Sequence, residues 1–281
     1  MDNRRLLLLL VFSFSLVMLW DAWQKYNQPK PAATAAVSTP QAPAPQLSTN
    51  LHAPLPVLPD TAAVRAPDKA ETFTVKTDLF VAHISRIGGD IVRLELNDYK
   101  DSTNKQKDFA LFEAKHQYVA QSGLIGEGLP NHKTSFSAVA GSAELGADAK
   151  TVVLRLEAPA GGGLKVAKTY TFTRGSYLID VAHEIDNGSD KEVLAHAYYQ
   201  LQRDTKAPDG ESSMVSTYTG PAVYTNQDKY QKVDFADIEK GKAKFATRAD
   251  DGWIAMVQHY FVAAWIPATG LPREFYMRKL E

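Results

Sequence analysis

An uncharged apolar run near the amino terminus constrains this chain more than any other feature. The run extends from Leu6 to Trp20, and with the next three residues, up to Trp23, it reaches about 18 residues, or roughly 27 Å of α-helix. That length is just enough to cross a hydrocarbon layer of about 30 Å, with Trp20 and Trp23 at the interface. We therefore expect a retained transmembrane anchor within residues 1–27.

Two other interpretations of the apolar run stay open. A cleaved signal peptide has a shorter apolar core, of about 7 to 15 residues, and a small-x-small cleavage site soon after it. The first such site here, Ala33–Ala35, lies well beyond the run and among prolines. A buried core helix is the third possibility. The length of the run favours the anchor over both.

Basic residues at the start of the chain predict the orientation of the anchor. Arg4 and Arg5 precede the run, which favours a cytoplasmic amino terminus under the positive-inside rule. Lys25 and Lys30 follow the run and oppose this orientation weakly. The residues after the anchor are then expected outside the cytoplasm. The chain has no cysteine, which fits such a domain without disulfides and fits a cytosolic protein equally.

The composition changes abruptly after the anchor. Nine of the fifteen prolines of the chain lie between Gln28 and Asp68, among Ala, Ser, Thr and Gln. Such a segment cannot bury enough apolar surface to offset its ordering entropy, so residues 28–70 are expected to form an extended tether. The other interpretation is a proline-rich ligand for a partner groove.

The charge pattern argues against nucleic acid as a partner. The formal net charge is −1, and no basic stripe interleaved with aromatic residues is found. The electrostatic pattern expected of a nucleic-acid-binding protein is therefore missing.

From residue 71 onward the apolar residues alternate with a period of two, which predicts half-buried strands. In the first stretch the alternating residues are Phe73, Val75 and Thr77, and the next stretch turns at Gly88–Gly89 and resumes at Ile91. Two further strands are expected over 192–202 and 252–267. No long helical periodicity competes with these segments. Strands joined by Gly, Pro and Asn turns predict a mainly β, antiparallel sandwich over 71–281.

The clearest hairpin lies within residues 161–186 and turns at Arg174–Gly175. Side chains of a strand alternate between its two faces, so each arm presents one set of residues to each side of the sheet. One face of the first arm carries Val166, Lys168, Tyr170 and Phe172; one face of the return arm carries Tyr177, Ile179, Val181, His183 and Ile185.

Four histidines fall inside predicted strands and were considered as metal ligands or general bases: His83, His183, His196 and His259. His183 and Glu184 must point to opposite faces of their strand, which prevents them from meeting at one metal. Histidines packed or hydrogen-bonded within a sheet explain the pattern better than a catalytic or metal site, although that role stays open.

Other candidate motifs are weaker. The glycines at 123, 126 and 128 could suggest a phosphate-binding loop, but no helix is expected after them, so a surface loop is predicted. Lys100–Asp108 is interpreted as a solvated connection, with an acidic-ligand patch as the alternative. Ser176 lies in a turn and has no nucleophile-elbow context. The sequence thus predicts no catalytic residue, no metal site and no cofactor.

The order of several short segments is similar to that of a known family. The anchor ends with "MLWDAWQ", and the domain contains "VKTDLFVAHISRIGGDIVRLEL", "AQSGLIG", "KTYTFTRGSYLIDVAHEIDN", "GPAVYTNQDKYQKVDF" and "GWIAMVQHYFVAAWIP". Together they resemble the amino-terminal half of the YidC family of bacterial membrane protein insertases, in order, up to about Pro267. Each motif alone is weak, whereas their order and spacing are specific.

The resemblance implies a location and a fold. It implies one transmembrane helix in the bacterial inner membrane, with its amino terminus in the cytoplasm. A periplasmic β-supersandwich, similar in fold to galactose mutarotases, would follow. Site residues for anchoring and orientation would be Arg4, Arg5, Leu6, Trp20 and Trp23.

The resemblance also implies a function without bond chemistry, so the chain is not expected to be an enzyme. The family inserts and helps to fold inner-membrane proteins, alone or with the Sec translocon. Expected partners are nascent inner-membrane proteins, the Sec translocon with its accessory subunits, and the lipid bilayer.

The sequence departs from the family pattern at its carboxyl end. The resemblance implies a five-helix membrane core with a groove arginine, which is not expected within these 281 residues, and the sandwich is expected to lack its last strands. No functional residue of the family can therefore be transferred to this chain. The alternative function is a membrane-tethered carbohydrate-binding or mutarotase-like module, for which Trp253, Trp265 and the tyrosines near Tyr198 would supply aromatic platforms.

Overall fold

The computed structural model describes Leu16, Met18 and Trp20 and then residues 72–138, 143–159, 161–211 and 217–280. The chain divides into two units, Met1–Ala53 and Pro54–Glu281. The three described residues of the first unit are helical and exposed. Among the described residues, no helix is both long and apolar enough to span a membrane. Apart from those three residues, the expected anchor and tether lie outside the described part of the chain.

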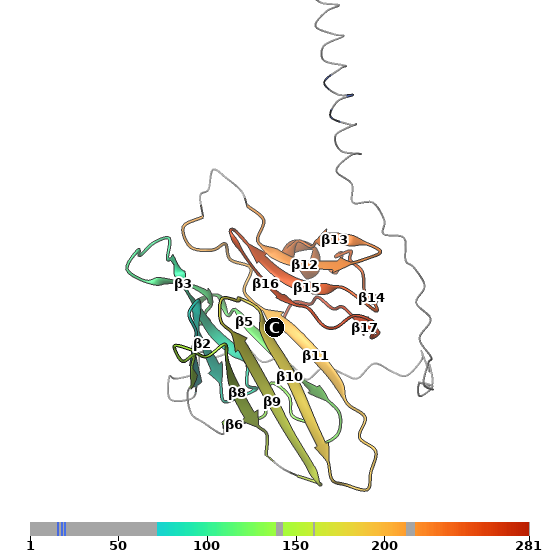
Figure 1. The fold of residues 1–281 in the computed structure, drawn as a ribbon. Coiled ribbons are helices and arrows are strands. Elements are labelled where there is room, and N and C mark those ends of the chain that lie inside the picture. The colour runs from blue at the N-terminus through green and yellow to red at the C-terminus, as the bar shows by residue number, and fades with distance from the viewer. Residues whose placement is uncertain are drawn as a thin grey trace, which may run out of the picture. The chain divides into compact units, whose positions relative to one another are not determined.

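The largest sheet of the second unit has the strand order β11–β5–β3–β2–β1–β7, with β4 also paired to β3 (Figure 1). Its pairings are antiparallel except for the short parallel pair of β1 and β7. The strands are β1 (Thr72–Lys76), β2 (Phe80–Ser85), β3 (Ile91–Lys100), β4 (Asp108–Phe112), β5 (Val119–Ile125), β7 (Ala143–Glu144) and β11 (His196–Gln202).

A second, antiparallel sheet has the order β10–β9–β8–β6. It comprises β6 (Ser137–Ala138), β8 (Thr151–Glu157), β9 (Leu164–Thr173) and β10 (Ile179–Asn187). The third sheet has the order β13–β12–β15–β16, and β14 pairs with β17. These strands are β12 (Gly220–Thr225), β13 (Lys229–Lys232), β14 (Arg248–Ala249), β15 (Trp253–Gln258), β16 (Phe261–Trp265) and β17 (Arg273–Glu274). The helices described in this unit are the 3₁₀ turn η2 (Ala114–His116) and α2 (Phe235–Glu239).

The main core is formed by inward-facing side chains of the first two sheets. Alternation along each strand places every second residue on the inner face. The core includes Phe73, Val75, Phe80, Ala82, Ile84, Ile91, Leu94 and Leu96 from the first sheet and Leu154, Leu156, Tyr170 and Phe172 from the second. The expected mainly β sandwich is therefore confirmed.

Two predicted turns are confirmed. Gly88 and Gly89 lie between β2 and β3 with φ of 76° and 60°, and Gly175 follows β9 with φ of 71°. Positive φ is accessible to glycine at little steric cost, which explains why the chain reverses at these points. The predicted shared face of Val166, Lys168, Tyr170 and Phe172 is also confirmed, and it is the inner face of β9, since all four are buried.

Three strand predictions need correction. The expected strand over 252–267 is a hairpin of β15 and β16, because the chain turns at His259 and Tyr260. This turn contains no Gly, Pro or Asn, the residues from which turns were predicted. The strand expected over 192–202 begins only at His196, and β1 ends before Thr77. Thr77 instead closes the turn into β2, where its hydroxyl accepts a hydrogen bond from the amide of Phe80 at 3.0 Å.

The prediction of a surface loop around Gly123, Gly126 and Gly128 is also partly wrong. Gly123 lies within β5, and the residues from Ser122 to Leu124 are buried. A Cβ atom at Gly123 would lie 2.6 Å from the hydroxyl of Tyr198 on the paired strand β11, so close packing requires this glycine. Gly126 and Gly128 do lie beyond the strand, and no helix follows them. The predicted connection Lys100–Asp108 is found between β3 and β4, although Lys100 itself ends β3 and Asp108 begins β4.

Candidate functional site

A buried lysine occupies the inner face of β9. The side chain of Lys168 is fully buried. Its ammonium donates hydrogen bonds to the carbonyl oxygens of Gly88 at 3.0 Å and Ser122 at 3.1 Å, and lies 3.5 Å from Oδ1 of Asp90. These three acceptors match the three donors of an ammonium group. Lys168 therefore joins the second sheet to two segments of the first.

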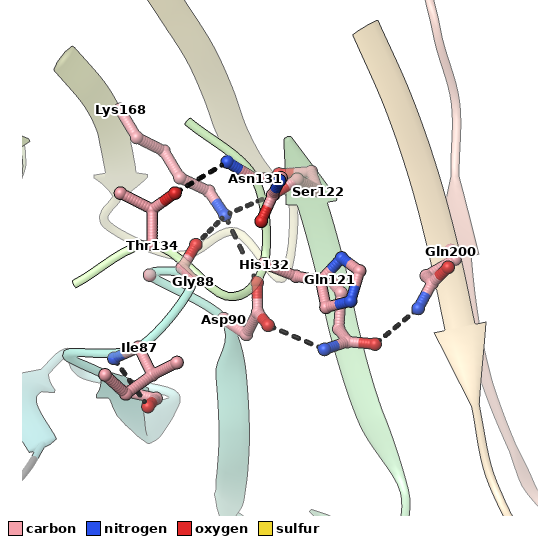
Figure 2. A network of polar contacts seen from close by, with 12 residues as sticks. Ile87, Gly88, Asp90, Gln121, Ser122, Asn131, His132, Thr134, Lys168 and Gln200 are labelled. Carbon is pink, nitrogen blue, oxygen red and sulfur yellow. Dashed lines mark hydrogen bonds and ion pairs between the residues drawn. The ribbon is translucent and has the colours of Figure 1, made fainter. Parts of the chain in front are cut away.

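The carboxylate of Asp90 extends this network across the first sheet, as Figure 2 shows. Asp90 is 3% exposed and lies directly before β3. Its Oδ2 accepts a hydrogen bond from Nε2 of Gln121 on β5 at 2.7 Å. Oε1 of Gln121 accepts in turn from the amide of Gln200 on β11. Polar groups thus form a continuous chain from β9 to β11 through the middle of the sandwich.

Burial shifts the pKa values of both ionisable groups of this pair. It raises the pKa of Asp90 to about 6, and the charge of Lys168 opposes that rise. It lowers the pKa of Lys168 to about 8, and the charge of Asp90 opposes that fall. At neutral pH both groups are therefore charged, and each depends on the other because an isolated buried charge is costly.

The glycine turn between β2 and β3 makes the network possible. A Cβ atom at Gly88 would lie 2.5 Å from Oδ2 of Asp90, and one at Gly89 would lie 2.9 Å from Cδ1 of Leu156. The carbonyl of Gly89 also accepts a hydrogen bond from the buried hydroxyl of Tyr170 at 2.5 Å. The turn is therefore fixed by both backbone conformation and close packing.

A second buried polar pair lies beside β5. Oη of Tyr198 is 2.6 Å from Nδ1 of His132 and accepts a hydrogen bond from the His132 amide at 2.9 Å. The two rings meet edge to face. The pair fastens the segment after β5 to β11, over the space that Gly123 leaves open.

His183 lies opposite Lys168 in the register of β9 and β10. Both of its ring nitrogens are buried, and neither has a hydrogen-bond partner among the described residues. Burial, followed by the positive charge of Lys168, lowers the pKa of His183 to about 4. The imidazole is therefore neutral at physiological pH. Glu184 points to the other face, as predicted, and pairs with Arg155.

The other predicted histidines are dispersed. His83 on β2 lies 3.3 Å from Oγ1 of Thr74 and 3.6 Å from a carboxylate oxygen of Glu95. His196 starts β11 and is exposed. His259 was expected in a strand but lies in the exposed turn after β15. These positions do not form a common site among the described residues.

The chemistry of the buried network is structural. Lys168 has no exposed surface and its donors face three acceptors, so its amine cannot meet a substrate. The alternation along the strand puts Lys168 on one face with Val166, Tyr170 and Phe172 but does not predict its role. A lysine between Val166 and Tyr170 on a buried face was the available signal, because such a charge needs a partner. Asp90 could not be identified as that partner without the topology.

The residues expected to anchor and orient the chain are not tested by this geometry. Arg4, Arg5, Leu6 and Trp23 lie outside the described residues. Trp20 lies in a helical segment and is 62% exposed. Their role at the membrane stays a prediction.

Comparison with known sequences identifies the sandwich. The profile of the YidC periplasmic domain family matches residues 72–281, which include every strand described above. The chain belongs to the YidC periplasmic domain family. The network of Asp90 and Lys168 therefore lies inside a YidC periplasmic domain, and the predicted family resemblance is confirmed.

Several curated relatives match along the whole chain. The protein from Dechloromonas aromatica (strain RCB), named membrane protein insertase YidC, is 57% identical over 282 residues, covering 100% of this chain and 51% of the relative. Those from Aromatoleum aromaticum and Nitrosospira multiformis carry the same name and are 51% and 44% identical, covering 100% of this chain and 52% and 53% of their own lengths. The chain thus spans about half the length of these relatives.

Proposed function

We propose that this chain forms the anchored, periplasmic portion of a membrane protein insertase. The observation that carries the proposal is the match of residues 72–281 to the YidC periplasmic domain, together with the relatives named as insertases. Residues 1–27 would anchor the chain in the inner membrane with Arg4 and Arg5 in the cytoplasm. Residues 28–70 would hold the sandwich away from the bilayer.

The proposed activity requires no bond chemistry. Moving a membrane protein into the bilayer means carrying polar groups through a layer without water, at a cost of several kcal/mol for each unsatisfied group. The sandwich described here would contribute contacts rather than a reaction. Its partners would be nascent inner-membrane proteins, the Sec translocon with its accessory subunits, and the bilayer itself.

The edge strand β16 supports contacts of this kind. Tyr260, Val262 and Ile266, in or beside β16, are 84%, 57% and 63% exposed. Exposed apolar side chains on an edge strand can be covered by a partner, and the unpaired backbone groups of the edge can bond to a strand of that partner. The strand itself is held to β11, because Nε1 of Trp265 donates to the carbonyl of Gln200 at 3.0 Å.

Two measurements test the proposal. Depletion of the native protein is expected to reduce membrane insertion of a reporter protein with a periplasmic tail; unchanged insertion would contradict the insertase function. Protease added to spheroplasts is expected to degrade the sandwich, whereas protection until the membrane is lysed would contradict its periplasmic location.

A photo-crosslinking residue locates the contact surface. Placed at Val262, it is expected to capture a Sec subunit or a nascent membrane protein. Val153 on β8 is the matched control, since it is 51% exposed and apolar but belongs to a different sheet. Equal capture at both positions would argue against the β16 edge.

The carbohydrate-binding alternative gains no specific support. Trp253 stacks on Tyr224 with ring centroids 5.5 Å apart, and Trp265 packs against Tyr199. Two hollows of the described domain are lined by other residues. The two tryptophans therefore act mainly as packing residues here.

A further inference from the structure

Three segments meet near the start of β5. They are the connection between β3 and β4, the turn containing η2, and the segment that follows β11. The amide of Asp204 donates to the carbonyl of His116 at 2.8 Å. The hydroxyl of Ser102 donates to the carbonyl of Asp209 at 2.7 Å. These bonds fix the three segments against one another.

Metal-ligating side chains gather where the segments meet. Glu113, His116 and Asp209 each place one possible ligand atom within 4.8 Å of the other two. Ligands of zinc lie about 2.0 to 2.2 Å from the metal, so neighbouring donors in a tetrahedral site are roughly 3.5 Å apart. Rotation of the two carboxylate side chains, one of them exposed, can close the remaining gap of about an ångström.

The imidazole of His116 is prepared for a ligand role. His116 is only 8% exposed, and its Nδ1 lies 3.1 Å from Oδ1 of Asp204. A carboxylate that accepts the proton of Nδ1 leaves the lone pair on Nε2, as in carboxylate–histidine–metal arrangements. Among the described residues no second hydrogen bond to this ring is found.

A small cavity lies at the same place. Its volume is about 30 Å³, and Glu113, His116 and Asp209 all line it, together with Asp101 and Tyr118. A cavity of this size holds one water molecule or one ion. His116 and the two carboxylates of Glu113 and Asp209 thus border a space of the right size for a single cation.

The local charge also favours a cation. Lys115 forms an ion pair with Asp209. The carboxylates of Glu113 and Asp101 line the same cavity. Three carboxylates therefore act on one point, and a bound metal would compete with the ammonium of Lys115 for Asp209.

We propose that Glu113, His116 and Asp209 bind one zinc ion, with Asp204 orienting the imidazole of His116. One imidazole nitrogen and two carboxylates are ligands that zinc accepts, and a water molecule would complete four-coordination. Calcium is a weaker match because it takes oxygen ligands. The ion would tie the segment after β11 to the turn before β5. This inference does not depend on the insertase function.

Isothermal titration of the full chain in detergent with zinc chloride at pH 7 tests the site. The decisive variant is Asp209→Asn, and the matched control is Asp108→Asn, since both residues are carboxylates paired with an exposed lysine. We expect the wild type to bind one zinc ion per chain. The zinc affinity should fall at least tenfold in Asp209→Asn and stay unchanged in Asp108→Asn. Equal binding by the two variants, or no saturable zinc binding by the wild type, would overturn the proposal.

Two further variants separate ligation from folding. Lys115→Met removes the competing ammonium and is expected to tighten zinc binding; unchanged or weaker binding would count against the site. Asp204→Asn is expected to weaken binding about 10- to 100-fold, the usual effect of losing such a partner. With cobalt(II) as the probe, its visible spectrum should change in Asp204→Asn while the circular dichroism of the apo protein stays unchanged. An unchanged cobalt spectrum would contradict the orienting role.

Discussion

Replacing Lys168 by methionine tests whether the buried pair acts as the structure indicates. Methionine keeps most of the volume of the lysine stem but removes the ammonium. The carbonyls of Gly88 and Ser122 then lose their donor, and the carboxylate of Asp90 loses its counter-charge while staying buried. Removing one partner of a buried pair typically costs 3–5 kcal/mol. We expect the free energy of unfolding to fall by about that amount at pH 7.

A second variant isolates the cause. Adding Asp90→Asn to Lys168→Met removes the orphaned charge, and the new amide can still contact Gln121. Burying neutral groups in place of an ion pair is often close to neutral for stability. The double variant is therefore expected to recover at least half of the loss, whereas Asp90→Asn alone leaves the ammonium of Lys168 unpaired and should destabilise.

The loss should also depend on pH. Burial raises the pKa of Asp90 to about 6 from 3.8, and loss of Lys168 raises it further because that charge opposed the shift. A group with a raised pKa stabilises the folded state at acid pH, and this contribution is lost as pH rises through the folded pKa. The deficit of Lys168→Met against the wild type should therefore be smaller at pH 5 than at pH 8.

Urea unfolding of the full chain in detergent, followed by circular dichroism at both pH values, measures these quantities. The reasoning is refuted if Lys168→Met stays within about 1 kcal/mol of the wild type, well under the expected cost of a broken buried pair. It is also refuted if the double variant is no more stable than the single one, or if the deficit does not grow from pH 5 to pH 8.

Three other predictions concern the same interior. Gly123→Ala should lower the free energy of unfolding by about 1–3 kcal/mol through overpacking against Tyr198. Gly161→Ala, with no atom within 4 Å of its Cβ, should leave the free energy of unfolding nearly unchanged. Equal losses of unfolding free energy in the two variants would contradict this. His183 should titrate near pH 4 in NMR spectra of its ring, because burial and Lys168 lower its pKa, so its contribution to stability is present above about pH 6.5 and lost as pH falls towards 4; titration near 6.5 would disprove it. Tyr170→Phe removes the hydrogen bond to Gly89 and should cost about 1–3 kcal/mol in urea unfolding, because the carbonyl stays buried; a neutral effect would mean that water replaces the hydroxyl.

The sequence was most informative where local chemistry determines structure. The alternation around Tyr170 and Phe172 and the turn at Gly88–Gly89 depend on near neighbours, and both were predicted correctly. The turn at His259–Tyr260 was missed because it lacks the usual turn residues. Local pattern therefore predicted the strands better than the points where they reverse.

The candidate site was less predictable because it depends on distant contacts. Lys168 is 78 residues from Asp90 and 46 from Ser122, so no local motif connects them. Gly123 looked like a loop residue because its neighbour Tyr198 lies on a strand that comes much later. Sequence reading could place Lys168 on a buried face, but only the sheet order identifies its partners.

The long reach of the buried network has a consequence for how the domain forms during synthesis. Asp90 cannot complete its contacts until β5, β9 and finally Gln200 on β11 have emerged. At 5–20 residues per second, roughly 5 to 20 seconds separate the synthesis of Asp90 from that of Gln200. Until β8 to β10 have also been made, the apolar faces of β1 to β3 have no opposite sheet. Contacts of such long range also slow folding. The amino-terminal strands are thus the part of the nascent domain most in need of protection from aggregation.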